Sequence, residues 1–278
     1  AGWSIDEHGP WTAFHGPGEL PLAGWKVHVS TLPHRAREVV GRAVRIAWEQ
    51  GVAVKALRTR ALVQASQQKY APLTASGKVV TAYPADESTL VRLVAALAEA
   101  LAGEPGPGVP GELAVAGAPV FLRHGAFTST WLVTAMGTAV PGVADAGGVT
   151  ADRRGPGGGR GHVPPAQLGP LLAAAPTRRL DVTGVSLVHR SNAGGVYGAT
   201  WADGRAVVLK EARRYAGLDA GGADAPTRLR HERDVLERLA GTGVAPEVHD
   251  YVLLGDSEFL VMTRVPGATL AEILAARH

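Results

Sequence analysis

A stretch rich in glycine and proline, residues 137–170, divides the chain into two parts whose apolar residues follow different patterns. It contains Gly155-Pro156-Gly157-Gly158-Gly159 and Pro164-Pro165 and shows little periodicity. This composition is typical of linkers and long loops. We therefore expect one domain over 1–135, a linker or mobile loop over 136–178 and a second domain over 179–278. The 278 residues are enough for two ordinary domains.

In the first part, short alternating segments precede segments with helical periodicity. Strands are predicted over 25–32, 52–57, 77–83 and 119–123, and helices over 33–50, 60–69 and 86–102. Asp86 is a suitable N-cap for the last of these helices, and Gly103 is a suitable end. In strand 25–32, the period of two places Lys26 and His28 on one face.

The second part has a β-β-β-α-β-β order. Strands are predicted over 182–189, 196–201, 205–211, 247–254 and 258–264, with a helix over 226–239. Taken with the first part, this order indicates an α+β protein.

Composition excludes several classes of function. The chain has no cysteine, which removes disulfides, thiolate nucleophiles, iron–sulfur clusters and Cys-ligated zinc. The net charge of +3 gives no argument for nucleic acid. The best apolar run, Leu90–Leu101, is interrupted by Arg92 and Glu99, and the start, Ala1–Pro10, is unlike a signal peptide. We expect a cytoplasmic protein with neither nucleic-acid nor membrane partners.

Basic side chains gather in the first part. They are Lys26, His28, Lys55, Lys69, Lys78, Arg123 and His124, together with Tyr70. Converging Lys and Arg suit a phosphate, and a lysine crowded by cations shifts toward the neutral amine, which is a general base. A nearby histidine is a suitable acid for a leaving group. These parts suit elimination of phosphate from a phosphorylated side chain, although lysines on strands more often simply face solvent.

The motifs around these residues resemble a known family. Trp25-Lys26-Val27-His28 resembles the Lys-x-His strand of phosphothreonine lyases, and more closely that of the lyase domain of class III and IV lanthipeptide synthetases. The later matches are Val54-Lys55-Ala56-Leu57-Arg58, Lys69-Tyr70-Ala71, Ser76-Gly77-Lys78 with Tyr83-Pro84, Gly103-Glu104-Pro105-Gly106-Pro107 and Arg123-His124-Gly125-Ala126-Phe127.

The resemblance implies a phosphothreonine-lyase-like fold and a role for each matched residue. Lys55 is the implied base that removes the α-proton, His28 the acid that protonates the departing phosphate, and Lys26 the group that stabilises the enolate-like charge. The implied phosphate-binding residues are Lys78, Arg123, Tyr70 and Lys69. The lyase needs no metal or cofactor. Pro72-Leu73 stand where relatives carry an arginine, and His124 replaces a tyrosine, which puts one substrate contact in question.

The second part resembles the N-lobe of a protein kinase, and specifically that of class III lanthipeptide synthetases. Lys210, in Val207-Val208-Leu209-Lys210, follows Val196 by 14 residues, and Glu232 follows Lys210 by 22 residues. The implied nucleotide-binding residues are Gly194, Gly195, Val196, Lys210, Glu232 and Met262, with Met262 in the gatekeeper position. Only the third glycine of the usual loop pattern is present, and glycine-rich hairpins are more often structural.

No His-Arg-Asp or Asp-Phe-Gly motif follows the hinge-like residues 259–267. Those motifs supply the catalytic base and the Mg²⁺ ligands, so we expect no phosphoryl transfer by this chain, which a radiolabelled-phosphate assay checks. The chain resembles the N-terminal part of a longer synthetase with a kinase C-lobe and a cyclase domain.

The resemblance implies a function for that synthetase. A complete kinase, using ATP or GTP with Mg²⁺, phosphorylates Ser and Thr of a ribosomal precursor peptide with a leader and a core. The lyase then eliminates phosphate to give dehydroalanine or dehydrobutyrine. Two alternatives stay open: a degenerate module that binds a leader or phosphopeptide without turnover, and a kinase-like fragment with an unrelated N-terminal domain.

Overall fold

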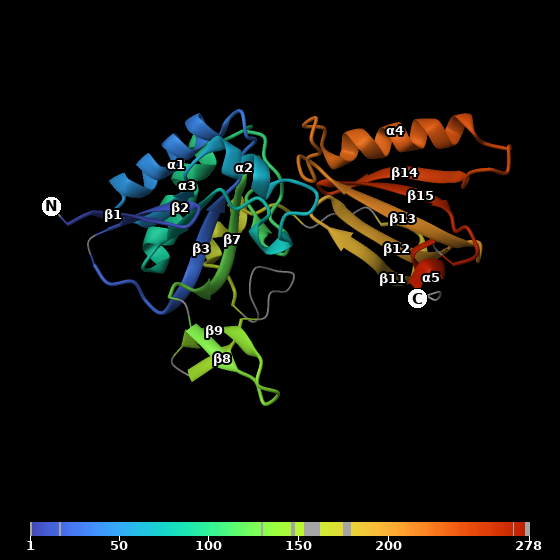
Figure 1. Cartoon of the computed structure of the whole chain (residues 1–278). Helices are drawn as coiled ribbons and strands as arrows, with labels where there is room; N and C mark the ends of the chain where they lie inside the picture. Colours follow the sequence, from blue (N-terminus) through green and yellow to red (C-terminus); the bar gives the residue numbers. More distant parts are fainter. Residues whose placement is uncertain are drawn as a thin grey trace.

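The structure is a computed structural model that describes residues 2–16, 18–128, 130–145, 148–152, 162–174, 179–268 and 270–275. It contains one large sheet with helices, a small sheet and a second large sheet with one long helix beside it (Figure 1). Every strand pairing within the three sheets is antiparallel. The α+β class predicted from the sequence is confirmed.

The first sheet has seven strands in the order β1-β2-β4-β5-β3-β7-β6. Its strands are β1 (Ser4–His8), β2 (Trp11–His15), β3 (Ala23–Val29), β4 (Ala53–Leu57), β5 (Val80–Tyr83), β6 (Leu113–Ala114) and β7 (Val120–Ala126), and its helices are α1 (Ala36–Glu49), α2 (Arg60–Ser66), η1 (Leu73–Ala75) and α3 (Glu87–Ala100). The sequence predicted neither β1 nor β2. All five side chains of β1 are exposed, so this edge strand has no buried alternating face to reveal it.

Helices α1 and α3 pack on one face of this sheet. Val27 and Val29 of β3 lie in the same buried cluster as Val39 of α1 and Leu93 of α3. Because strand side chains alternate between faces, Lys26 and His28 project from the opposite face. The predicted N-cap Asp86 is confirmed, since its carboxylate accepts a hydrogen bond from the Thr89 amide.

The segment expected to be a linker contains regular structure. Strands β8 (Thr130–Val133), β9 (Ala139–Asp145) and β10 (Gly148–Ala151) form a three-stranded sheet, and η2 (Ala166–Leu171) places the fully buried Leu168 in the core of the first sheet. These residues of the expected linker or mobile loop therefore form strands and a short helix. Gly142 shows why composition misleads: a Cβ there would lie 2.9 Å from Val149, so glycine permits close packing of the hairpin. The run Gly155–Gly159 lies outside the described residues.

The second large sheet has the order β11-β12-β13-β15-β14. Its elements are β11 (Val182–Ser191), β12 (Gly194–Trp201), β13 (Ala206–Arg213), α4 (Ala225–Arg238), β14 (Val248–Leu254) and β15 (Ser257–Thr263), followed by α5 (Leu270–Ala275). The predicted β-β-β-α-β-β order is confirmed. Leu229 and Leu236 of α4 pack against Leu260 and Met262, so α4 covers one face of the sheet (Figure 1). Within the described residues, no helix combines the length and apolar character needed to cross a membrane.

Candidate functional site

Strand register brings four predicted residues onto one face of the first sheet. Thr81 of β5 lies opposite His28 of β3 on one side and opposite Lys55 of β4 on the other. Lys26, two residues before His28, lies opposite Arg123 of β7. Directly opposed residues share a face, so these cationic groups line one surface. His28 and Arg123 are buried there, 3% and 7% exposed.

A buried carboxylate that the sequence analysis missed joins two of the predicted residues. Glu112 Oε2 lies 2.6 Å from His28 Nδ1, and its Oε1 lies 3.0 Å from Lys78 Nζ. Because a carboxylate only accepts hydrogen bonds, Nδ1 carries a proton and Nε2 is left for a substrate. Glu112 lies in a loop without periodicity, directly before the two-residue strand β6, so the sequence carries no clear signal for it.

The two lysines of the cluster lie over aromatic rings. Lys55 Nζ is 4.8 Å from the centre of the Trp11 ring and 5.9 Å from that of Tyr83, and Lys26 Nζ is 5.7 Å from that of Tyr83. Burial, together with Arg123 and Lys55, lowers the pKa of Lys26 to about 8. Burial and Lys78 lower the pKa of Lys55. Both changes favour a neutral amine, the form that accepts a proton.

The electrostatics of His28 are a balance of opposing effects. Burial lowers the pKa of its imidazole, Glu112 opposes this, and Lys78 and Lys26 add to the lowering. Burial alone would raise the pKa of Glu112, but His28 and Lys78 hold it below its usual range. The pair is thus a carboxylate beside a predominantly neutral imidazole. A bound phosphate would add negative charge and favour the imidazolium.

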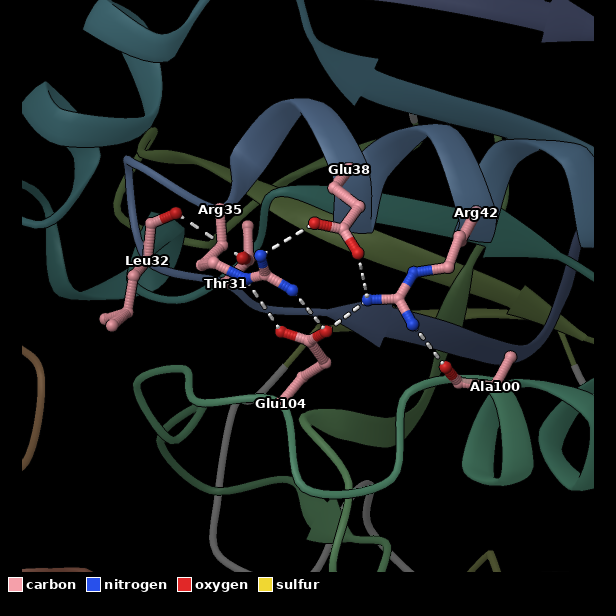
Figure 2. A network of polar contacts seen from close by, with 7 residues as sticks. All are labelled: Thr31, Leu32, Arg35, Glu38, Arg42, Ala100 and Glu104. Carbon is pink, nitrogen blue, oxygen red and sulfur yellow. Dashed lines mark hydrogen bonds and ion pairs between the residues drawn. The ribbon is translucent and has the colours of Figure 1, made fainter.

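The loop that carries Glu112 is fixed at its other end by Arg35, which directly precedes α1, and by Arg42 of α1. The Glu104 carboxylate accepts hydrogen bonds from Arg35 Nη2 at 2.8 Å and Nε at 3.2 Å, and it also pairs with Arg42 (Figure 2). Arg42 donates in addition to the Ala100 carbonyl at the end of α3 (Figure 2). Glu104, part of a motif quoted above, therefore ties the loop 103–112 to α1.

The predicted phosphate-binding residue Arg123 is paired with another acidic side chain. Asp152, which follows β10, forms an ion pair with Arg123, and both side chains are largely buried. The ring of His124 stacks on that of His162, with centroids 3.5 Å apart. Residues of the supposed linker thus reach the site, and composition gave no sign of it.

Two of the predicted phosphate-binding residues lie elsewhere. Tyr70 is 81% exposed, and Lys69 Nζ lies 5.2 Å from the centre of its ring. The backbone of Lys69 pairs with Leu218 and Asn192 of the second part. Within the described residues, neither side chain joins the cluster around His28. Their role in phosphate binding stays a prediction.

In the second part, Lys210 and Glu232 form the predicted pair. Lys210 Nζ lies 2.5 Å from Glu232 Oε1, joining β13 to α4. Val196 lies opposite Lys210, and Met262 lies opposite Val208, so Val196, Lys210 and Met262 share the sheet face that α4 covers. An ion pair of this kind can aim a lysine at phosphates.

Both glycines of the hairpin have close neighbours within the protein, backbone at Gly194 and a side chain at Gly195. A Cβ at Gly194 would lie 2.1 Å from the Glu211 carbonyl oxygen, and one at Gly195 would lie 2.4 Å from the Tyr197 hydroxyl oxygen. The Gly195 amide donates to Glu211 Oε2 at 3.1 Å. This amide is engaged by a carboxylate, so a nucleotide phosphate would have to replace Glu211 to accept from it. Among the described residues, no group of three or more His, Asp or Glu is placed to hold a metal ion.

Comparisons with known proteins agree with the motif analysis. The profile of the family described as "RamC, N-terminal domain" matches residues 1–166. The "Probable SapB synthase" of Streptomyces coelicolor (strain ATCC BAA-471 / A3(2) / M145) is 43% identical over 293 residues. That alignment covers all of this chain but only 31% of the relative, so the chain spans about a third of the relative's length.

Proposed function

We propose, since this chain belongs to the RamC N-terminal domain family, that it takes part in lanthipeptide biosynthesis as a phosphoserine and phosphothreonine lyase. The observation that carries the proposal is the shared face of Lys26, His28, Lys55 and Arg123, with Glu112 behind His28. The class III assignment, the kinase and the peptide substrate belong to the same proposal. The name "Probable SapB synthase" describes the relative as a synthase.

In the proposed reaction, the neutral amine of Lys55 removes the α-proton of the phosphorylated residue and becomes an ammonium. The electron pair of the Cα–H bond forms the Cα=Cβ double bond, and the Cβ–O bond breaks toward phosphate. The His28 imidazolium gives its Nε2 proton to the departing oxygen, while Lys26 stabilises negative charge on the substrate carbonyl. Phosphoserine yields dehydroalanine, and phosphothreonine yields dehydrobutyrine.

Lys78 and Arg123 are the proposed phosphate ligands. Arg123 offers a planar fork that matches a phosphate, and its ion pair with Asp152 is the contact that a substrate must displace. No metal or cofactor has a step in this elimination.

For the second part, we propose the N-lobe side of a nucleoside triphosphate site. Lys210, held by Glu232, would contact the phosphates, and Val196 and Met262 would contact the base. When bound, ATP or GTP with Mg²⁺ supplies the phosphoryl group that Ser and Thr receive. The kinase C-lobe and the cyclase of a full-length synthetase are the proposed partners in the same chain.

Mass spectrometry of a phosphoserine peptide incubated with the chain tests the elimination. We expect the peptide to lose one phosphoric acid, Lys55→Ala to abolish that loss, and Arg45→Ala, an exposed change on α1, to leave it intact. An unchanged peptide with the wild-type chain would contradict the lyase. If the peptide nevertheless binds, the result favours the alternative of a binding module without turnover.

A further inference from the structure

A partly buried arginine from the second sheet reaches into the first part of the chain. Arg213, at the end of β13, donates through Nη1 to Ser76 Oγ at 3.2 Å and through Nη2 to the Gly108 carbonyl at 2.5 Å. Nη1 also lies 3.1 Å from both oxygens of Asn192. Burial lowers the pKa of Arg213 to about 10, so it stays charged at neutral pH.

The two segments that Arg213 holds also touch each other. A Cβ at Gly77 would lie 3.1 Å from the Pro107 carbonyl oxygen and 3.2 Å from that of Gly108, so the segments 76–78 and 107–109 are in close contact. Gly77 has φ +73°, which favours glycine. The Arg213 guanidinium thus adds hydrogen bonds between two segments whose backbones are already in contact.

Each segment leads directly to one partner in the site. Lys78 follows Ser76 by two residues, and Glu112 follows Gly108 by four. Lys78 and Glu112 form the ion pair that lies against His28. Movement of either segment would therefore change the distance between Glu112 and the imidazole.

Asn192, which accepts hydrogen bonds from Arg213, is itself held in place. Asn192 is fully buried, and its Nδ2 donates to the Ser66 carbonyl at 3.2 Å and to the Gln68 carbonyl at 3.0 Å. Ser76, Asn192 and Gly108 are uncharged acceptors, and a buried guanidinium that loses one of them leaves hydrogen-bonding capacity unsatisfied. The hydrogen bonds of Arg213 and Asn192 to the first part of the chain form a joint between the two parts. This joint depends on a specific geometry.

We propose that Arg213 is a positioning residue for the elimination site, holding the segments of Ser76 and Gly108 so that Lys78 and Glu112 stay against His28. This rests on the proposed lyase function for its consequence in catalysis, but the effect on His28 is independent of turnover. Arg213 lies outside residues 1–166, so the site depends on the second part of the chain.

The test compares the full chain with Arg213→Met, Arg213→Lys and Arg214→Met. Arg214 is the exposed neighbour, and its side chain contacts the Tyr215 hydroxyl. NMR titration of the His28 ring is the first readout, since Glu112, Lys78 and Lys26 face this ring and set its pKa. We expect Arg213→Met to lower that pKa because Glu112 moves away, Arg213→Lys to lower it less, and Arg214→Met to leave it unchanged.

Release of phosphate from a phosphoserine peptide is the second readout. We expect kcat/KM to fall about 10- to 100-fold in Arg213→Met, as for a small misplacement of reacting groups. A His28 pKa in Arg213→Met equal to that of the wild type would overturn the inference. If Arg213→Met does not fold, the same comparison is made with Arg213→Lys. Absence of turnover in the wild type would instead contradict the lyase and leave the titration result to decide the role of Arg213.

Discussion

At the scale of single residues, Glu112 carries a prediction about the pH dependence of the elimination. It raises the pKa of His28 against the larger lowering by burial. Glu112→Gln removes that opposing charge, so the imidazole loses its proton at lower pH. Since the proposed acid must be protonated, we expect the descending limb of the pH profile of kcat/KM to move to lower pH. The rate at neutral pH should fall by about 10- to 100-fold, up to the lower end of what a general acid contributes.

Glu104→Gln is the matched control for this change. It alters a glutamate of the same loop whose partners are Arg35 and Arg42 (Figure 2). Its descending limb should stay at the wild-type pH, even if the rate is lower. A common displacement of the limb in both variants would contradict the role of Glu112.

Asp152 gives a prediction of the opposite sign. Its carboxylate neutralises Arg123, the proposed phosphate ligand. Asp152→Asn should free this guanidinium and tighten binding of a phosphoserine peptide by about 1 kcal/mol, or about fivefold in Kd. Isothermal titration calorimetry with the non-turnover variant Lys55→Ala as background measures it.

The exposed Asp203, which pairs with Arg205 in a hairpin of the second part, provides the control Asp203→Asn. This change should leave the affinity unchanged. Weaker binding by Asp152→Asn would mean that Asp152 helps to build the phosphate site.

The sequence predicted those site residues that lie on strands. A period of two places Lys26 and His28 on one face, and the register of the neighbouring strands adds Lys55 and Arg123. Glu112 and Asp152 could not be found in this way, because they lie in irregular segments where sequence spacing does not fix direction. Lys69 and Tyr70 show the converse, since a matched motif did not place them beside the others.

At the scale of elements, the helix η2 decides how far the first part extends. Leu168 is fully buried among residues of the first core, whereas Val163 in the same segment is 84% exposed. We expect Leu168→Ala to lower the free energy of unfolding by about 2–5 kcal/mol, as for other buried leucines. Val163→Ala should change it by less than about 0.5 kcal/mol.

Urea unfolding followed by tryptophan fluorescence measures this difference. Equal midpoints for the two variants would show that 162–174 is a detached linker. The contrast also explains the error of the sequence analysis. A short helix with one buried residue leaves no periodic pattern, while α1, α3 and α4 were predicted because each has several buried positions at helical spacing.

At the scale of the whole molecule, the arrangement of the two parts was beyond the sequence. Gly194 and Gly195 are implied by the resemblance to bind nucleotide, and Asn192 just before them is fully buried, with its side chain bonded to the carbonyls of Ser66 and Gln68. Contacts between residues more than a hundred positions apart depend on tertiary shape, which neither periodicity nor motif spacing encodes. At this scale, only the order of elements within each part could be predicted.

This joint predicts that the two parts unfold together. Asn192→Ala would remove the hydrogen bonds that its side chain makes with the Ser66 and Gln68 carbonyls and with the Arg213 guanidinium, at a cost of about 1–3 kcal/mol for each buried group left unsatisfied. Differential scanning calorimetry should therefore show one transition for the wild-type chain and a lower, broadened or divided transition for the variant. Ser186→Ala, an exposed change on β11, preserves the joint and should melt like the wild type. If Asn192→Ala also melts like the wild type, the Asn192 side chain does not couple the unfolding of the two parts.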